Sequence, residues 1–156
     1  MINLDIPGFR NVEIEHLVLD FNGTIAVNGK LIPGVKDILN QLASNLEVHI
    51  VTADTFLSAQ QELQGVQCKL IVIPDEQQSA EKLKYVNKLG LMKTVAIGNG
   101  RNDTFMLKDA IISIAVIQAE GCAASALVNA KIVCTNILDG LELLQNPKRI
   151  IATLRQ

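Results

Sequence analysis

The chain has 156 residues, a length that suits one domain able to bury about two thirds of its unfolded surface. Hydrophobic residues make up 49% of the sequence and charged residues 19%, and one Tyr, four Phe and no Trp leave the core to aliphatic side chains. The formal charge is −2, from 14 basic and 16 acidic residues. This balance argues against nucleic acid or an anionic membrane as a partner. We expect residues 1–156 to form a single domain.

The cysteines and the N-terminus indicate the compartment. Cys68, Cys122 and Cys134 are widely spaced without metal-type pairing, which favours three small buried hydrophobes in a reducing compartment. No basic segment followed by an apolar run opens the chain, and no stretch approaches the roughly 20 apolar residues of a membrane helix. We therefore expect a soluble, cytoplasmic protein.

Short apolar runs alternate with helical patterns along the chain, an order typical of a parallel sheet with crossover helices. The runs are rich in Val, Ile and Leu, as expected for central strands covered on both faces. Strands are predicted at residues 16–19, 48–51, 70–73, 94–97, 112–116 and 132–134. The sequence thus predicts an α/β fold, a three-layer Rossmann-like domain with a mainly parallel sheet and helices on both faces.

Helices are predicted between these strands. Pro33 suits the first turn of one helix, where its missing N–H costs nothing. Apolar stripes at helical spacing follow it and recur later, at Val35, Ile38, Leu39 and Leu42, around Leu83, Val86 and Leu89, around Ile137, Leu138, Leu141 and Leu144, and in a last helix over 147–154. Before the first helix, Asn28-Gly29 lies between the apolar-containing arms of residues 25–32, and both residues tolerate positive φ. We expect a small hairpin there, beside the carboxyl end of the first strand.

Ligands of such sheets bind beyond the carboxyl ends of the strands. The first strand ends in Asp20, and the turn Phe21-Asn22-Gly23-Thr24 follows it, so a carboxylate would lie beside free N–H groups that can hold phosphate. The second strand leads into Thr52-Ala53, where a hydroxyl and N–H suit a phosphate oxygen. Lys82, on the helix before the fourth strand, could reach the same crevice as a counter-charge. The predicted phosphate-binding residues are Asp20, Asn22, Gly23, Thr52, Ala53 and Lys82.

The fourth strand is followed by the turn Gly98-Asn99-Gly100-Arg101-Asn102-Asp103. Its amide and carboxylate oxygens suit Mg²⁺, which proteins usually hold with one or two carboxylates, water and substrate phosphate. Each of these features alone is more often a cap or a turn, but all fall at carboxyl ends or facing positions in chain order. This turn therefore offers Asn99 and Asp103 as candidate metal ligands.

These motifs together resemble those of the haloacid dehalogenase-like superfamily of phosphohydrolases. Asp20-Phe21-Asn22-Gly23-Thr24 resembles its first motif, Asp-x-Asp-x-Thr. Thr52 resembles the second motif, Lys82 the third, and residues 98–103 the fourth, Gly-Asp-Gly-x-Asn-Asp. The first and fourth motifs are also similar to those of the phosphorylation domain of P-type ATPases, and the chain resembles most their small soluble relatives.

The resemblance implies a mechanism. Asp20 would attack the phosphorus of a small phosphorylated substrate and form an aspartyl-phosphate. Mg²⁺ would bridge Asp20 and the phosphate, with the main-chain carbonyl of Asn22 and the fourth motif completing its shell. Thr52 and Lys82 would neutralise the charge of the transferring group, so Asp20, Asn22, Thr52 and Lys82 form the predicted catalytic set.

Two positions depart from the superfamily pattern. Asn22 stands where most of its phosphatases carry an acid that protonates the leaving group and activates water, and losing such a group typically costs about 10²–10⁴-fold. Asn99 stands where a metal-binding Asp is usual, and a neutral amide oxygen is a poorer Mg²⁺ ligand. The sequence therefore predicts a slow phosphohydrolase, or alternatively a non-catalytic protein that binds phosphate, metal or a partner through the same crevice.

The spacing of the motifs leaves no room for a cap domain, because 31 residues, 21–51, separate Asp20 from Thr52. An uncapped site must be covered by its own hairpin, a neighbouring subunit or a macromolecular substrate. By analogy with tetrameric uncapped sugar-acid phosphatases, the hairpin at 25–32 is a candidate contact in a homodimer or homotetramer. Of the remaining polar residues, Asp54 is expected to cap the following segment, Arg101 to be a solvated turn residue, and His16 and His49 to be structural rather than ligands.

Overall fold

The computed structural model describes residues 1–53 and 58–156, so Asp54, a predicted cap, lies outside the described residues. A parallel six-stranded sheet forms the centre, with the strand order β10-β9-β8-β3-β6-β7. Its strands are β3 (His16–Asp20), β6 (Glu47–Thr52), β7 (Lys69–Val72), β8 (Thr94–Gly98), β9 (Ile112–Val116) and β10 (Ile132–Cys134). All six predicted strands are confirmed, with ends shifted by one residue at most.

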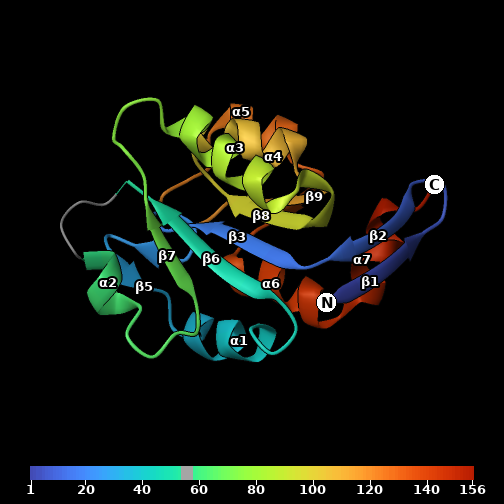
Figure 1. Cartoon of the computed structure of the whole chain (residues 1–156), viewed down its shortest axis with the longest axis horizontal. Helices are drawn as coiled ribbons and strands as arrows, with labels where there is room; N and C mark the ends of the chain where they lie inside the picture. The colour runs from blue at the N-terminus through green and yellow to red at the C-terminus, as the bar shows by residue number, and fades with distance from the viewer. Residues whose placement is uncertain (54–57) are drawn as a thin grey trace.

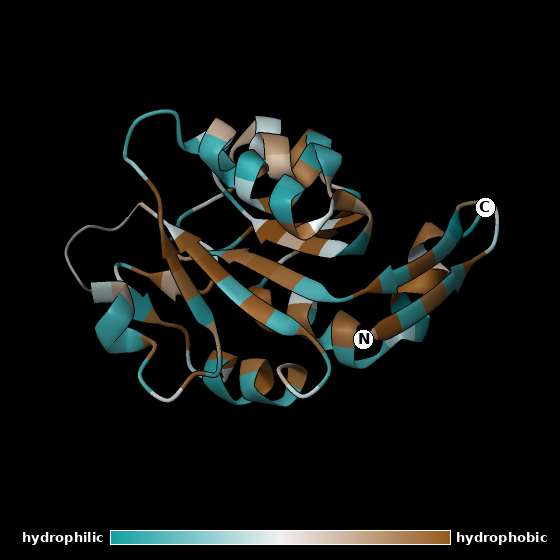
Figure 2. Ribbon diagram, viewed as in Figure 1, coloured by the Kyte–Doolittle hydropathy of each residue, from teal (hydrophilic) through white to brown (hydrophobic). Residues whose placement is uncertain are grey.

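Helices cover both faces of this sheet, which confirms the three-layer α/β fold (Figure 1). One face carries α3 (Gln78–Leu89), α4 (Thr104–Asp109) and α5 (Ala124–Asn129), and the other carries α1 (Val35–Leu42) and α6 (Ile137–Gln145). Successive residues of β3 serve the two layers: Leu17 and Leu19 pack in the α1–α6 core, and Val18 packs in the α3–α4 core. Buried side chains on both faces explain why the central strands are apolar almost throughout (Figure 2).

The predicted hairpin is confirmed as β4 (Ala26–Val27) and β5 (Lys30–Leu31), paired antiparallel beside the end of β3. Asn28 and Gly29 form its turn with φ values of 51° and 75°. This is the conformation that the Asn-Gly pair predicts. The prediction that Pro33 lies in the first turn of a helix is wrong. Helix α1 begins at Val35, after Gly34, whose φ of 90° turns the chain into the helix.

An antiparallel hairpin at the N-terminus was missed by the sequence analysis. It consists of β1 (Ile2–Ile6) and β2 (Arg10–Ile14), and it packs beside α7 (Pro147–Leu154) at the end of the molecule where both chain termini lie (Figure 1). Its buried residues are every second one: Leu4, Ile6, Val12 and Ile14. Alternation of apolar and polar residues is the signal that would have found both strands.

The chain between the motifs is short. The hairpin and α1 lie between β3 and β6. The described chain from β6 to β8 contains α2 (Ser58–Glu62), β7, α3 and a 3-10 turn, so no cap domain is inserted within residues 1–53 and 58–156. The remaining elements are the 3-10 turns η1 (Leu91–Lys93) and η2 (Arg101–Asp103). In the same part of the chain no helix is both long and apolar enough to cross a membrane. The three cysteines are free thiols and are half-buried rather than buried.

Candidate functional site at the carboxyl edge of the sheet

The predicted motif residues meet at the carboxyl edge of the sheet. β3 ends at Asp20, and its neighbours in the sheet are β6, which ends at Thr52, and β8, which leads into η2 and Asp103. Helix α3 covers the sheet nearby and directs the Lys82 ammonium inward. Leu83, the next residue and part of the predicted apolar stripe, is only half-buried. The helix therefore buries a cation beside its apolar stripe.

A three-membered ion cluster forms the centre of the site. The Lys82 ammonium lies 2.5 Å from Oδ1 of Asp20 and 2.6 Å from Oδ1 of Asp103. The side chains of Lys82 and Asp103 are fully buried, and that of Asp20 is 9% exposed. Burying such charges is costly unless each is paired and hydrogen-bonded. One ammonium between two carboxylates satisfies this condition and leaves a local charge of −1.

The environment of the cluster shifts the pKa values of its members. Burial, followed by the negative charge of Asp103, raises the pKa of Asp20 from 3.8 to about 7, although Lys82 and the Thr24 hydroxyl oppose the shift. Burial alone would lower the pKa of Lys82, but the carboxylates of Asp20 and Asp103 outweigh it and raise that pKa. The ammonium therefore stays charged, and a proton or a cation at Asp20 relieves the excess of negative charge.

Asp103 is held by the turn that carries it. Its Oδ2 accepts hydrogen bonds from the backbone N–H groups of Asn99, at 3.0 Å, and Gly100, at 2.8 Å. A Cβ atom on Gly98 would collide with the Asp103 carboxylate, so glycine is required where β8 ends. With Lys82 on Oδ1, both oxygens of this carboxylate accept from the protein.

Asn99 connects the first and fourth motifs. The Thr24 hydroxyl lies 3.1 Å from Oδ1 of Asn99 and 3.2 Å from Oδ2 of Asp20, while Nδ2 of Asn99 donates to the Gly121 carbonyl at 3.1 Å. Gly23 leaves room for this side chain: its φ is 80°, and a Cβ there would collide with the Asn99 amide. The amide is thus used at both ends, and an Asp at this position would bring a carboxylate oxygen against the Gly121 carbonyl.

Gln118, which the sequence analysis missed, holds the loop of the first motif. Its Nε2 donates to the carbonyls of Gly23, at 2.9 Å, and Thr24, at 2.5 Å, and its Oε1 accepts from the N–H of Ile137 at 2.9 Å. Gln118 lies two residues beyond β9 at the same edge. Ligands of parallel sheets bind beyond the carboxyl ends of the strands, so polar residues that follow each strand are candidate site residues. Applied to the strand at 112–116, this rule would have identified Gln118.

Three further predicted residues lie around this centre. Thr52 is buried at the end of β6, Ala53 follows it half-buried, and Asn22 is exposed in the turn after β3. Asn22 also forms a bridge with Ala26, which closes the turn onto the β4–β5 hairpin. The fold thus places Asn22, Thr52 and Ala53 at the edge where Asp20 lies.

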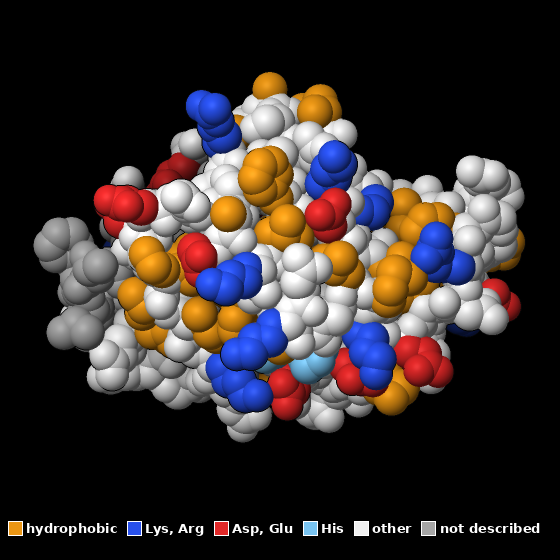
Figure 3. Space-filling view, turned by 45° about the horizontal axis from the view of Figure 1, so that its top comes forward, with side chains coloured by type: hydrophobic (Ala, Val, Ile, Leu, Met, Phe, Trp, Pro, Cys, Tyr) orange, Lys and Arg blue, Asp and Glu red, His pale blue; other side chains and the backbone are white. Residues whose placement is uncertain are grey.

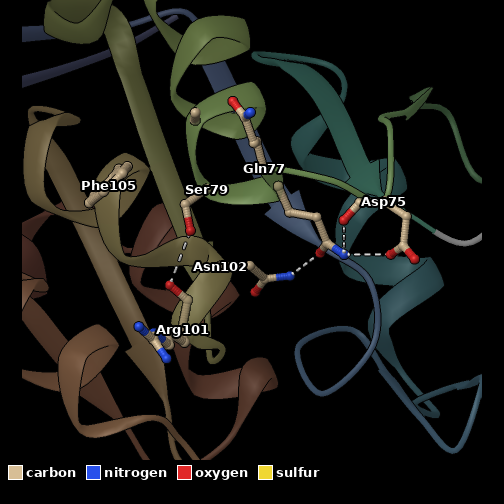
Figure 4. Close-up of a pocket in the computed structure, with 8 residues that line it drawn as sticks. Asp75, Gln77, Ser79, Arg101, Asn102 and Phe105 are labelled. Atoms are coloured by element: carbon tan, nitrogen blue, oxygen red, sulfur yellow. Dashed lines mark hydrogen bonds between the residues drawn. The ribbon is translucent and has the colours of Figure 1, made fainter.

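A pocket of about 510 Å³ opens beside the site, between the start of α3 and the start of α4 (Figure 4). Asn102 donates to Oε1 of Gln78 at 2.6 Å, and the Ser79 hydroxyl donates to the Arg101 carbonyl at 3.4 Å, which joins α3 to η2 across its floor. Arg101 is exposed and lines the pocket, as does Phe105. Arg101 begins η2, so the turn that ends at Asp103 also forms part of the pocket wall.

The oxygen atoms at this edge fit a hard cation such as Mg²⁺. Asp20 supplies a carboxylate at the rim of the cluster, and Oδ1 of Asn99 converges with it on the Thr24 hydroxyl. The excess negative charge of the cluster favours a cation at Asp20. Oδ2 of Asp103 already accepts from two backbone N–H groups, whereas Oδ1 accepts from Lys82 and has a second lone pair with which it could bind the cation.

Solved structures of low sequence identity share this architecture. A 3-deoxy-D-manno-octulosonate 8-phosphate phosphatase from Moraxella catarrhalis, in complex with magnesium ion, phosphate ion and a KDO molecule, is 17% identical with a TM-score of 0.65, over 91% of this chain and 94% of that one. The cobalt-bound deoxy-D-mannose-octulosonate 8-phosphate phosphatase from Haemophilus influenzae is 10% identical with a TM-score of 0.72, over 92% and 94%. The chain has the fold of the uncapped haloacid dehalogenase-like phosphohydrolases.

Two proteins of Methanocaldococcus jannaschii are similar to this chain in sequence. Uncharacterized protein MJ0073 of Methanocaldococcus jannaschii is 44% identical over 63 residues, which are 40% of this chain and 68% of that protein. Uncharacterized protein MJ0072 of the same organism is 49% identical over 39 residues, 25% of this chain and 89% of that protein. No protein-family model matches the chain. The chain belongs to the same family as MJ0073.

Proposed function

We propose that residues 1–156 act as one haloacid dehalogenase-like domain and that the protein is a slow, Mg²⁺-dependent phosphohydrolase with Asp20 as its nucleophile. The observation that carries the proposal is the buried bridge of Lys82 between Asp20 and Asp103 at the carboxyl edge of the sheet. Purely structural ion pairs seldom bury an excess carboxylate, because an unbalanced charge costs stability. A site that receives a cation and a phosphate gains from such an arrangement.

The proposed reaction has two steps. A carboxylate oxygen of Asp20 attacks the phosphorus of a phosphate ester, the P–O bond to the alcohol breaks, and the leaving oxygen takes a proton from water. Water then attacks the aspartyl-phosphate and releases inorganic phosphate and the carboxylate. Bound Mg²⁺ would neutralise charge on the transferring phosphoryl group, held by Asp20, the main-chain carbonyl of Asn22 and Asn99, with Asp103 as the further predicted ligand.

The residues around Asp20 supply positioning and charge. Lys82 fixes one oxygen of Asp20 and brings a permanent positive charge to the phosphoryl site. Thr52, Ala53 and Gly23 would place hydroxyl and N–H donors toward the other phosphate oxygens. Asn22 cannot transfer a proton, so the leaving group and the attacking water go without a general acid–base residue. This is our reason for proposing slow turnover.

The substrate we propose is a small phosphate ester. The two sugar-acid phosphatases that share the fold make a phosphorylated sugar acid a reasonable first member of a substrate panel. The pocket beside η2 supports this choice, because Arg101 offers a positive charge to a second anionic group of the substrate. Free, half-buried thiols suit a reducing compartment, so we place the activity in the cytoplasm.

The hairpin β4–β5 is proposed to help cover the site, alone or in a homo-oligomer. Glu62 of α2 bonds the Lys30 ammonium at 2.8 Å and the Leu31 N–H at 2.9 Å, and Glu120 accepts from the Asn28 N–H at 2.8 Å. These bonds hold the hairpin beside the first motif. Sedimentation of the protein with and without Asn28→Ala and Lys30→Ala would show whether the hairpin also joins subunits.

The test of the proposed function is phosphate release from a panel of phosphate esters with and without Mg²⁺, with Asp20→Asn as the control. We expect metal-dependent turnover that falls to background in the variant. Acid-quenched protein should also carry a phosphoryl group that hydroxylamine removes and that Asp20→Asn lacks. Turnover that survives in Asp20→Asn would contradict the assignment of the nucleophile.

A second function is favoured by one observation, the use of Asn99. Its amide bonds Thr24 on one side and Gly121 on the other, so the residue at the position of the superfamily's metal-binding Asp already has partners within the protein. This arrangement supports a non-catalytic haloacid dehalogenase-like protein that binds phosphate, metal or a partner. Phosphate binding measured by calorimetry, without turnover of any ester and without a trapped phosphoryl group, would favour this alternative.

A further inference from the structure

A second polar cluster lies at the opposite, amino-terminal edge of the sheet. His16 begins β3, and its register partner Glu47 begins the neighbouring strand β6, two residues before His49. Nδ1 of His16 lies 3.2 Å from Nε2 of His49, and Oε2 of Glu47 lies 3.5 Å from the first nitrogen and 3.6 Å from the second. Three atoms that can bind a metal therefore form a nearly equilateral triangle.

The size of this triangle matches a tetrahedral metal ion. Bonds of about 2.0–2.1 Å to nitrogen and oxygen place the ligands of tetrahedral Zn²⁺ roughly 3.3–3.4 Å apart. The three separations in the cluster scatter closely around this value. Among the described residues, a search for three His, Cys, Asp or Glu side chains whose ligand atoms lie close enough to hold a metal ion finds His16, Glu47 and His49.

A neighbouring side chain orients the buried histidine. Nδ1 of His49 lies 2.8 Å from the Tyr85 hydroxyl on α3, so its Nε2 points to the triangle. His49 is fully buried, and burial, followed by the positive charges of His16 and Lys69, lowers its pKa to about 4. The ring is therefore neutral at pH 7. A histidine that ligates a metal commonly hydrogen-bonds its other nitrogen in this way.

The fourth coordination position faces water. The Glu47 side chain is 54% exposed and that of His16 is 14% exposed, so an ion has a path to the triangle from the surface. Figure 3 shows histidine surface between basic and acidic side chains on this side of the molecule. An open fourth position would be completed by a water molecule.

The charges that face the cluster act in both directions. Lys69 on β7 bonds Oε2 of Glu47 at 3.0 Å and would oppose a dication. Glu15 lies 4.0 Å from Nε2 of His16, so its negative charge would favour a cation nearby, and it is itself paired with Lys93 at 2.8 Å. An ion can bind when Nδ1 of His16 carries no proton, and the ammonium of Lys69 beside Oε2 would weaken its binding.

We propose that His16, Glu47 and His49 bind one transition-metal dication, Zn²⁺ in preference to Mg²⁺, with water as the fourth ligand. Two imidazoles and one carboxylate suit Zn²⁺, whereas Mg²⁺ prefers oxygen ligands alone. The site is separate from the carboxyl edge, since four residues of strand place His16 about 13 Å from Asp20 along β3. It joins β3, β6 and, through Tyr85, helix α3, the elements that carry Asp20, Thr52 and Lys82.

The metal-free alternative is a hydrogen-bonded chain. In it, Nδ1–H of His16 donates to Nε2 of His49, and Nδ1–H of His49 donates to the Tyr85 hydroxyl. This chain satisfies the same buried atoms without an ion, and it agrees with the structural role that the sequence predicts for both histidines. The two interpretations differ in what they predict for added metal.

The test is a calorimetric titration of the whole protein with Zn²⁺ in the presence of excess Mg²⁺, repeated in Asp20→Asn. We expect one Zn²⁺ per chain in both proteins, because the carboxyl edge takes no part. Co²⁺ should bind at the same site and give the intense visible absorption of a four-coordinate ion. Absence of saturable Zn²⁺ binding, or Co²⁺ bands typical of thiolate ligands, would overturn the proposal in favour of the hydrogen-bonded chain or the free cysteines.

Variants assign the ligands. Glu47→Gln and His16→Gln, both at accessible positions, are each expected to weaken Zn²⁺ binding at least about 100-fold, and Tyr85→Phe about tenfold as the loss of an orienting bond. Glu13→Gln, an exposed carboxylate on β2, is the matched control and should bind as the wild type does. Lys69→Met should tighten binding by removing the opposing charge. Equal affinity in Glu47→Gln, His16→Gln and the control would exclude this site.

Discussion

The two ends of β3 carry polar clusters built in different ways. At the carboxyl end, Asp20 meets Lys82 and Asp103, which come from a helix and from a glycine-rich turn. At the amino end, His16 meets Glu47 and His49, which are residues of strands in register. The first cluster is almost entirely buried, with the Asp20 side chain 9% exposed, and carries an excess negative charge, while the second has an exposed carboxylate. Removing a charge should therefore cost far more at the first end than at the second.

The largest effect is expected for Lys82→Met, which removes the cation between two carboxylates. Asp20 and Asp103 would face each other in a buried site, and breaking a buried ion cluster in this way costs about 3–5 kcal/mol. Urea unfolding at pH 7.5 measures the loss. Because a proton on one carboxylate relieves the repulsion, the variant should be less destabilised at pH 5.

Lys84→Met is the matched control on the same helix, because its ammonium is 77% exposed and pairs with Glu81 at 3.5 Å. An exposed pair of this kind contributes at most about 1 kcal/mol. Lys69→Met at the other end of the sheet should also stay within that range, since Lys69 is 61% exposed. A similar loss for Lys82→Met and Lys69→Met would remove the contrast between the two clusters.

The next largest loss of stability is expected for Asn99→Asp, which adds a negative charge at the carboxyl edge. The bond from Nδ2 to the Gly121 carbonyl would be lost and replaced by oxygen against oxygen, at a cost of about 1–3 kcal/mol. Thermal unfolding with and without Mg²⁺ measures the change. If Mg²⁺ binds beside Asp20, it should recover part of the lost stability in Asn99→Asp and have a smaller effect on the wild type.

Asn129→Asp provides the comparison for an amide that also donates to a carbonyl, that of Ser125 at 2.8 Å, but lies away from the site. It should be destabilised without any recovery by Mg²⁺. Equal recovery in both variants would mean that Mg²⁺ acts through general screening rather than at the carboxyl edge.

The candidate site at the carboxyl edge could be predicted from the sequence because most of its residues lie in short, continuous motifs. Asp20 and the glycines around it, and the turn at 98–103, are short segments whose residue types and chain order suffice once parallel strands are expected. The six strands were predicted for a similar reason, since each is a short run of buried aliphatic residues. Lys82 was named from its place on the helix before the fourth strand and from the superfamily resemblance, because nothing in the helix pattern marks a lysine as buried.

The amino edge was not predictable in the same way. His16 and Glu47 are 31 positions apart, and only the parallel register of β3 and β6 makes them neighbours. The bonds of Gln118 to the first motif depend likewise on the path of the loop after β9. The β1–β2 hairpin was missed for another reason: each strand has only five residues, so its alternation of apolar and polar residues is a short signal, and packing against α7 stabilises it. The features that the sequence analysis missed thus depend mostly on contacts between segments that are distant in the chain.

Asn22→Asp sharpens the functional side of the comparison. An acid two residues after Asp20 could protonate the leaving group and activate water, so we expect turnover to rise at least about tenfold where proton transfer limits the reaction. The exposed position of Asn22 makes the change structurally neutral. Steady-state phosphate release and the lifetime of the phosphoryl-enzyme measure the effect. Asn28→Asp, in the exposed turn of the hairpin, is the control and should leave turnover unchanged.

The smallest effect expected is on the pH dependence of stability, where the two ends of β3 act in opposite directions. The pKa of Asp20 is higher in the folded state, about 7 against 3.8, so its contribution to stability is present below pH 3.8 and is lost as pH rises to 7. The pKa of His49 is lower in the folded state, about 4 against 6.5, so its contribution is present above pH 6.5 and is lost as pH falls to 4. Between pH 4 and 6.5 the two slopes partly cancel in the wild type. Urea unfolding across pH 4–8 measures this dependence. Compared with the wild type, stability should rise more steeply with pH in Asp20→Asn and fall more steeply with pH in His49→Gln. Parallel curves for all three proteins would mean that neither buried group titrates as its surroundings require.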